Sequence, residues 1–255
     1  MAVRTSRTIR LGQLGLLAGF VVVLQYLATS GLVGNITLAA PTAMVSTMVD
    51  LLASGAIVND VVRTTSAVLA AFLLAVVVGV PIGWLLWRYG TLQRVLDPYL
   101  IAYYAMPVFA FYPLLIALFG LNELPIVLIA FAMSVVAIVI NTANGFGQVR
   151  EVFADVGRSL NLTRWQSFRH VFLPAATPYI FTGLKLGFIY ALIGVIASEF
   201  ILANAGLGFQ VSYDYRNFAT DRMYAVMLLV VIFAVVANVV LRRIEDRLYR
   251  RSVSR

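Results

Sequence analysis

The sequence predicts an all-α protein that crosses a membrane about six times. Of its 255 residues, 62% are apolar and only 12% are charged, and the mean hydropathy is +0.93. A soluble domain is closer to half apolar and a quarter charged, so this chain has too few polar residues to cover a surface in water. Its apolar residues also gather in runs of about 20, the length that a membrane-crossing helix needs. We expect one transmembrane domain over residues 1–255.

Six segments qualify as transmembrane helices. In chain order they are Leu11–Leu32, Thr64–Trp87, Tyr99–Phe119, Leu124–Thr142, Pro174–Leu202 and Met223–Leu241. A shorter interfacial helix is expected at Pro41–Ala53, because proline suits a first helical turn and apolar residues recur there at helical spacing. Pro107 and Pro113 interrupt the third span, and Lys185 lies inside the fifth. Protein or water, and not lipid, must surround these positions.

The arginines predict the orientation of the chain. Six crossings place both termini on one side, and that side receives fifteen arginines, whereas the other receives only Arg63, Arg216 and Arg222. Short cytoplasmic loops are enriched in Lys and Arg. We therefore expect a multi-pass protein of the bacterial cytoplasmic membrane with both termini in the cytoplasm. The first arginines and apolar run resemble a signal peptide, but the run is long and no clear cleavage site follows, so retention is expected.

Several classes of function are disfavoured by the composition. The net charge of +8 does not indicate nucleic-acid binding, because the arginines lie between apolar runs. There is no cysteine, and the single histidine, His170, has no partner ligands, so no metal site is expected. Clustered acids and a Gly-x-Ser-x-Gly elbow are also absent, so we expect no catalytic residues.

The longest cytoplasmic connection, about residues 145–173, has an organised pattern. Glu151–Leu160 is typical of a short helix, and Asn161 interrupts it. Asparagine tolerates the left-handed conformation that such a turn usually needs. Thr163, with Gln166 three residues later, is a capping-box pattern that opens a second helix. The sequence therefore predicts a helix-turn-helix under the membrane.

An aromatic stripe runs along the second helix of this loop. Trp165, Phe168 and Phe172 share one face, beside Arg164 and Arg169. Two interpretations are open. The stripe packs on the protein's own helices or at the lipid interface, or it docks a partner protein, because exposed Trp, Phe and Arg are typical of docking surfaces.

The same loop resembles the coupling motif of ABC-importer permeases. That motif is Glu-Ala-Ala, three residues, Gly, nine residues, Ile, one residue, Leu-Pro. The sequence keeps its spacing without a gap, with Asp155-Val156-Gly157, Asn161, Val171 and Leu173-Pro174 at the motif positions. It departs at Asp for Glu, at Val and Gly for the two Ala, and at Asn for the turn Gly.

Further segments resemble the nitrate/sulfonate/taurine branch of these permeases, and the resemblance covers roughly residues 38–250. The matching segments are Pro113-Leu114-Leu115 with Phe119-Gly120, Asn141-Thr142, Arg158-Ser159-Leu160, Thr163-Arg164-Trp165-Gln166, Thr182-Gly183-Leu184-Lys185, Gly206-Leu207-Gly208-Phe209 and Arg216-Asn217-Phe218.

This resemblance implies a type I ABC importer permease fold and a transmembrane permease subunit. Its partners would be a second permease subunit, expected to be a copy of itself, a cytoplasmic ABC ATPase dimer, an extracytoplasmic solute-binding protein and the lipid membrane. The substrate would be a small organic solute or anion of the nitrate/sulfonate/taurine-like class. The expected ATPase-coupling residues are Asp155, Gly157, Asn161, Thr163, Trp165, Phe168 and Arg169.

A nucleotide site on this chain is not expected. The only lysine, Lys185, is followed by leucine within a hydrophobic run. A phosphate-binding P-loop instead needs Gly-x-x-x-x-Gly-Lys-Ser/Thr. We therefore expect no cofactor on this chain, with ATP and Mg²⁺ bound by the partner ATPase.

The translocation path is expected to use residues at membrane depth in the third, fourth and fifth spans. The candidates are Tyr103, Tyr104, Met106, Pro107, Phe109, Asn141, Lys185 and Glu199. Lys185 and Glu199 lie within about 40° of the same helix face, and charged residues inside a span mark function by default. The alternatives are that Lys185 reaches the cytoplasmic headgroups and that Glu199 pairs with a neighbour near the outer surface. Relatives often carry an arginine near Tyr104, and its absence slightly favours an organic solute.

Two other functions compete with the importer. A stand-alone channel or scaffold would explain the spans but not the coupling motif. A membrane enzyme would need the catalytic clusters that the sequence lacks.

Overall fold

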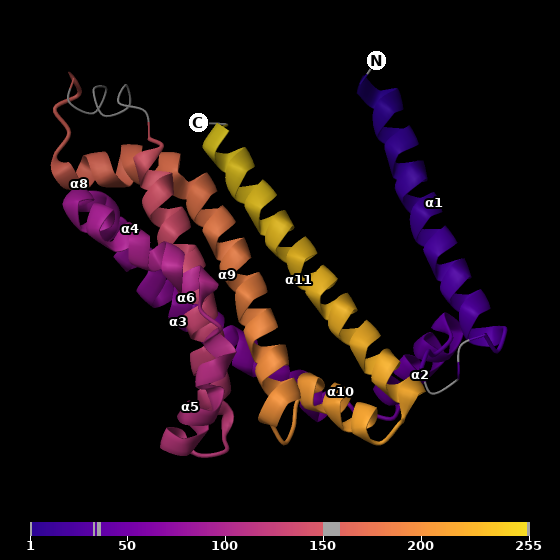
Figure 1. Ribbon diagram of the computed structural model, residues 1–255. Helices are drawn as coiled ribbons and strands as arrows, with labels where there is room; N and C mark the ends of the chain where they lie inside the picture. Colours follow the sequence, from indigo (N-terminus) through magenta and orange to yellow (C-terminus); the bar gives the residue numbers. More distant parts are fainter. Residues whose placement is uncertain (1, 33, 35–36, 150–158, 254–255) are drawn as a thin grey trace.

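The computed structural model describes residues 2–32, 34, 37–149 and 159–253. All the regular elements within these residues are helices. The long ones, α1 (Ala2–Thr29), α3 (Val58–Arg88), α6 (Glu123–Gly147), α9 (Leu173–Leu202) and α11 (Thr220–Val253), run between two ends of the molecule (Figure 1). This confirms the all-α prediction.

By length and composition, four helices of the described chain are able to cross a membrane. They lie at Val58–Arg88, Glu123–Gly147, Arg164–Ile201 and Thr220–Glu245, at the second, fourth, fifth and sixth expected spans. A bent pair in the third region makes a fifth if it counts as one span. In the first region the described apolar helix is Gly15–Thr29, which is shorter than a full crossing.

The third region differs from the single span expected at Tyr99–Phe119. Helix α4 (Gly90–Ala105) ends before Pro107, and a 3-10 turn η1 (Val108–Phe111) leads into α5 (Tyr112–Phe119). The segments Gly90–Tyr103 and Val108–Phe119 meet at an angle of 81°. Proline lacks an N–H and disfavours the helical conformation in the residue before it. Met106 is accordingly extended, with φ −78° and ψ 129°. The proline that the sequence marked as an interruption therefore ends the helix.

Two short helices lie across one end of the molecule. One is α2 (Pro41–Ala53), with the bounds that the sequence predicts. The other, α10 (Leu207–Arg216), was not predicted and lies between α9 and α11. Figure 1 places α2 and α10 at the end opposite to α8, and both chain termini on the α8 side. After the sides that the sequence predicts for them, we call the end with α2 and α10 the outer end and the other the coupling end.

The core lies where α6 packs between α3 and α9. Small residues let the backbones approach. A Cβ at Gly83 of α3 would lie 2.6 Å from Thr142 of α6, and one at Gly194 of α9 would lie 2.7 Å from Ala130. Close packing of small residues is how helices associate in lipid, which offers no hydrophobic drive between them. These three helices therefore form a closely packed frame for the residues described next.

Candidate coupling surface and translocation hollow

The turn at Asn161 and the helix that follows it have the predicted local geometry. Asn161 has φ 49°, the left-handed conformation expected of a turn residue. At the start of α8 (Arg164–Ser167), the Thr163 hydroxyl accepts from the Gln166 N–H at 3.3 Å. The side-chain Oε1 of Gln166 accepts from the Thr163 N–H at 2.9 Å. Both bonds of the capping box are therefore present. The first half of the expected coupling motif, with Asp155 and Gly157, lies outside the described residues.

The aromatic stripe divides into an inward and an outward part. The Phe168 ring lies 5.9 Å from both Trp84 of α3 and Phe146 of α6, and Phe172 lies 5.3 Å from Trp87. Phe168 and Phe172 therefore pack on the protein's own helices, as one of the two interpretations held.

Trp165 differs, because its side chain is 67% exposed. Its ring stacks on Phe168 at 5.7 Å, so the packed ring below supports the exposed one. Arg164 and Arg169 are exposed beside it. His170 is exposed as well, with Nδ1 3.0 Å from the Gln166 carbonyl oxygen. Within the described part of the loop, Trp165 and the two arginines thus form an exposed surface.

The coupling segment continues into the fifth span without a break in the helix. A π-helical turn η2 (Phe168–Phe172) joins α8 to α9, so that Arg164–Ile201 forms one uninterrupted helix. A π turn widens the helix locally and is often found at functional sites. Trp165 and the transmembrane part of α9 thereby belong to one continuous helix.

A hollow of about 280 Å³ opens at the break between α4 and η1. Its lining includes four of the residues predicted for the translocation path, Tyr103, Met106, Pro107 and Phe109. Val108, Met133 of α6 and Tyr190 of α9 complete it. The side chain of Tyr104 lies outside the described part of the structure. Met133 and Tyr190 were not predicted, because in the sequence they are ordinary apolar-helix residues and only packing brings them to the break.

Three other path candidates lie away from this hollow. The Lys185 ammonium pairs with the Glu245 carboxylate of α11 at 2.8 Å, which is an alternative that the sequence did not suggest. Asn141 donates to the Ala137 carbonyl oxygen of its own helix at 2.8 Å. Glu199 is 1% exposed and is hydrogen-bonded to Thr64 and Gly208, as the neighbour-pairing alternative held. In the described structure these three residues connect or pack helices.

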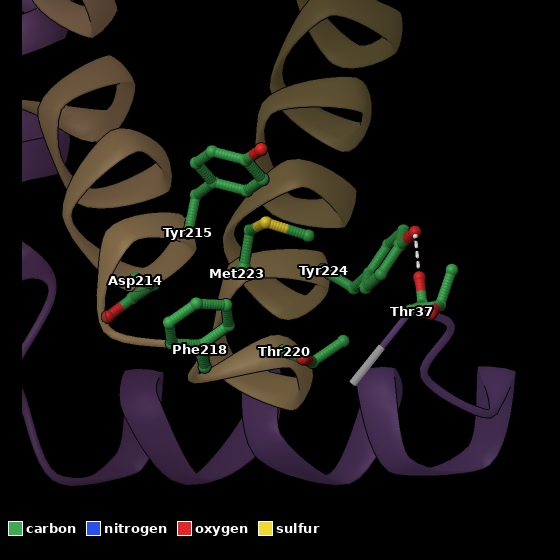
Figure 2. A pocket seen from close by; sticks show the side chains of 7 residues that line it. All are labelled: Thr37, Asp214, Tyr215, Phe218, Thr220, Met223 and Tyr224. Atoms are coloured by element: carbon green, nitrogen blue, oxygen red, sulfur yellow. Dashed lines mark hydrogen bonds between the residues drawn. The ribbon is translucent and has the colours of Figure 1, made fainter. Parts of the chain in front are cut away.

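A second hollow, of about 260 Å³, lies at the outer end between α10, α11 and the segment before α2 (Figure 2). The Tyr224 hydroxyl donates to the Thr37 carbonyl oxygen at 3.0 Å on one side of it. On the other side Asp214 is 2% exposed, with Oδ2 3.4 Å from the Arg222 Nε. Burial raises the pKa of the Asp214 carboxyl, and the nearby Arg222 opposes that shift. Sequence reasoning missed this hollow because its walls come from three separate segments.

Metal chemistry has no support in the described part of the chain, where no cluster of three His, Cys, Asp or Glu side chains is able to hold an ion.

Comparison with known proteins identifies a family and a fold. Residues 75–253 match the family of binding-protein-dependent transport system inner membrane components. A putative ABC transporter permease of Methanocaldococcus jannaschii is 30% identical over 200 residues, covering 78% of this chain and 75% of that protein. The taurine transport system permease TauC of Escherichia coli K12 is 30% identical, and the match covers 71% of this chain and 66% of that protein. The nitrate import permease NrtB of Synechocystis is 30% identical, and the match covers 62% of this chain and 58% of that protein.

Solved structures share the fold at lower sequence identity. The MetNI methionine ABC transporter in an inward-facing conformation gives a TM-score of 0.65 at 19% identity, covering 75% of this chain and 95% of that one. An amino acid ABC transporter with histidines gives 0.61 at 19% identity, covering 79% and 96%. The helical arrangement therefore agrees with the relatives found by sequence. The chain belongs to the family of binding-protein-dependent transport system inner membrane components and is a permease subunit of an ABC importer.

Proposed function

We propose that the loop of about residues 145–173 is where this permease subunit receives the force of ATP hydrolysis. The observation that carries this proposal is the exposed Trp165, stacked on the packed Phe168 at the start of the long helix Arg164–Ile201. A rigid exposed tryptophan beside arginines is the composition of an interface hot spot. A groove on a cytoplasmic ABC ATPase would receive Trp165, while Asn161 and Thr163 set its angle.

The rest of the assembly follows from this site. The coupling end, with α8 and both termini, faces the cytoplasm of a bacterial cell, in agreement with the arginine asymmetry. The outer end, with α2 and α10, meets an extracytoplasmic solute-binding protein. The partner ATPase dimer binds ATP and Mg²⁺, and this chain has no enzymatic activity of its own. A second copy of the permease, together with lipid, covers the apolar outer faces of the long helices.

The hollow at Tyr103, Pro107 and Phe109 is proposed as part of the translocation path. Among the described residues that line it none is charged, and the Tyr103 and Tyr190 side chains carry its hydroxyl groups. At about 280 Å³ it lies just below the usual volume of a drug-sized pocket. It therefore suits a small solute of the nitrate/sulfonate/taurine-like class, and an organic one better than a bare inorganic anion, which would need a cationic partner.

The test measures binding of the ATPase to permease variants. We expect Trp165→Ala to weaken association with the cognate ABC ATPase by more than about 30-fold, because truncating a buried aromatic anchor costs about 2 kcal/mol or more. The control is Tyr89→Ala, which removes another exposed aromatic at the same end. Pull-down titration from nanodiscs gives both affinities. Equal affinity for wild type and Trp165→Ala would remove Trp165 from the interface.

A further inference from the structure

The start of α10 is held by side chains from two other helices. The Gly206 N–H donates to Asp60 Oδ1 at 2.8 Å, and the Leu207 N–H donates to Thr64 Oγ1 at 2.9 Å. The Gly208 N–H donates to Glu199 Oε2 at 2.9 Å. The first N–H groups of a helix have no partner inside it, and α10 has no side-chain cap of its own. Three consecutive N–H groups are thus capped by Asp60, Thr64 and Glu199, which we call the clasp.

Thr64 and Glu199 form the connected and buried part of the clasp, whereas Asp60 is partly buried. The Thr64 hydroxyl, which accepts from Leu207, lies 2.9 Å from each oxygen of the Glu199 carboxylate, to which it donates its proton. Thr64 is 0% exposed. Negative charge is favoured at a helix N-terminus, where the peptide dipoles present their positive end. Both clasp carboxylates lie at that end, so electrostatics and hydrogen bonding favour the same arrangement.

The glycines at this point are required by the close approach of α10 to Glu199. Gly206 has φ 107°, a conformation that side chains rarely adopt, and a Cβ there would overlap the Glu199 carboxylate. A Cβ at Gly208 would overlap the Ile196 carbonyl oxygen. The backbone of α10 therefore lies directly on α9, with no side chain between them.

The helix that carries Glu199 is the one that carries Trp165 at its other end. Arg164–Ile201 is uninterrupted, so at 1.5 Å per residue the path along the helix between the two positions is about 50 Å, with α8 lying across the direction of α9 (Figure 1). Pulling α10 away from α9 would break the bond between the Gly208 N–H and the buried Glu199 carboxylate, and pulling it away from α3 would leave the Gly206 and Leu207 N–H groups without their acceptors. The three helices therefore stay together when one of them moves.

We infer that the clasp is the outer terminus of the coupling pathway. Asp60 and Thr64 of α3 and Glu199 of α9 are positioning residues that make α10 follow the displacement of α3 and α9 together, so that events at the ATPase change the packing of the outer end. This inference rests on the proposed function of the loop at residues 145–173. It assigns to Glu199 a mechanical role in place of the path-lining role expected from the sequence.

The experiment uses the absence of cysteine from the natural sequence. Ser212→Cys places one thiol at a buried position of α10, and Ser54→Cys places one at an exposed position of the same end. The permease, complexed with its ATPase in nanodiscs, is treated with a bulky hydrophilic maleimide, either without nucleotide or trapped with ATP and vanadate. We expect the labelling rate of the Ser212→Cys thiol to differ by about tenfold between the two states, which corresponds to about 1.4 kcal/mol in local opening. Ser54→Cys should label at one rate in both states.

A matched pair of variants isolates the clasp. Thr64→Val keeps the shape of threonine but removes the hydroxyl that joins Leu207 to Glu199, whereas Thr64→Ser keeps that hydroxyl. We expect Thr64→Val to abolish the dependence of Ser212→Cys labelling on vanadate trapping and Thr64→Ser to retain it. If Thr64→Val does not assemble, Asp60→Ala, which removes a less buried acceptor, takes its place.

The outcomes separate this inference from the proposed function. An unchanged vanadate response in Thr64→Val would overturn the clasp. If the Ser212→Cys thiol is labelled at the same rate in both states while Asp60, Thr64 and Glu199 are unchanged, transmission to the outer end is overturned. This holds even if the ATPase binds and traps vanadate normally. A chain that binds no ATPase at all would overturn the proposed function, and this inference would fall with it.

Discussion

The two ends of the helix Arg164–Ile201 are held by different kinds of contact. At the coupling end, packing is aromatic, and the outermost ring, Trp165, is left largely in solvent. At the outer end, the contacts are hydrogen bonds, and Thr64 and Glu199 are fully buried. The exposed Trp165 is the residue proposed to bind another chain, whereas Thr64 and Glu199, which are buried, must find their hydrogen-bond partners within this chain.

This difference gives the ends different tolerances to change. The packed rings at the coupling end tolerate small shifts, because dispersion contacts are individually weak and weakly directional. The outer end does not, because hydrogen bonds offset the cost of removing a buried carboxylate from water, and that cost is no longer offset once a bond is stretched or removed. Variants at the outer end should therefore have the larger effect on folding.

The largest effect is expected at the point where α10 touches α9. Gly208→Ala would force a methyl group against the Ile196 carbonyl oxygen, which is fixed within α9. Overpacking of this kind costs up to about 3 kcal/mol, which would lower the melting temperature by roughly 6–12 °C for a chain of this size. Thermal unfolding followed by fluorescence-detected size exclusion measures this change.

The matched control for Gly208→Ala is Gly147→Ala at the coupling end. Gly147 is also helical, and a Cβ there meets nothing within 4 Å. Alanine at an open helical position is expected to be neutral or stabilising by up to about 1 kcal/mol. Equal melting temperatures for the two variants would show that α10 does not lie on α9 as described.

The sequence predicts the coupling end well, because its signals are local. Thr163 and Gln166 lie three residues apart, and a capping box is readable from that spacing alone. Asn161 at the turn is likewise a local preference. The hydropathy runs locate α3, α6, α9 and α11 for the same reason, since each crossing is contained in one segment.

The clasp at the outer end could not be predicted, because the residues that form it are distant from one another in the chain. Thr64 and Glu199 are 135 residues apart, and neither has a neighbour in sequence that suggests the other. Because charged residues inside a span usually mark function, the sequence led us to expect Glu199 and Lys185 to line the translocation path. In the structure each has a partner on another helix, Thr64 for Glu199 and Glu245 for Lys185. The break at Met106 lies between these cases: Pro107 marks it, but only the fold places Met133 and Tyr190 beside it.

A smaller effect on stability is expected from substitutions of two rings at the coupling end, Phe168 and Trp165. Phe168→Ala removes a ring that packs on Trp84 and Phe146, and we expect a loss of about 2 kcal/mol in the free energy of unfolding. Trp165→Ala removes an exposed ring and should change stability by less than about 0.5 kcal/mol. Denaturation of the isolated permease in detergent measures both. A loss for Trp165→Ala as large as that for Phe168→Ala would mean that Trp165 is a packing residue and not a docking one.

The smallest effect is a pH dependence at the outer end. Burial raises the pKa of Asp214, so the folded chain binds that proton more tightly than the unfolded chain does. Stability then falls as the pH rises from the ordinary aspartate pKa of about 4 toward the folded value, because ionising the buried carboxyl is unfavourable. Asp214→Asn should flatten this part of the melting-temperature profile, while Asp221→Asn, which removes an exposed carboxylate, controls for the loss of one negative charge. A wild-type melting temperature that instead rises with pH over that window, and does so less in Asp214→Asn, would show that attraction to Arg222 outweighs burial. The hollow of Figure 2 would then be held by that ion pair.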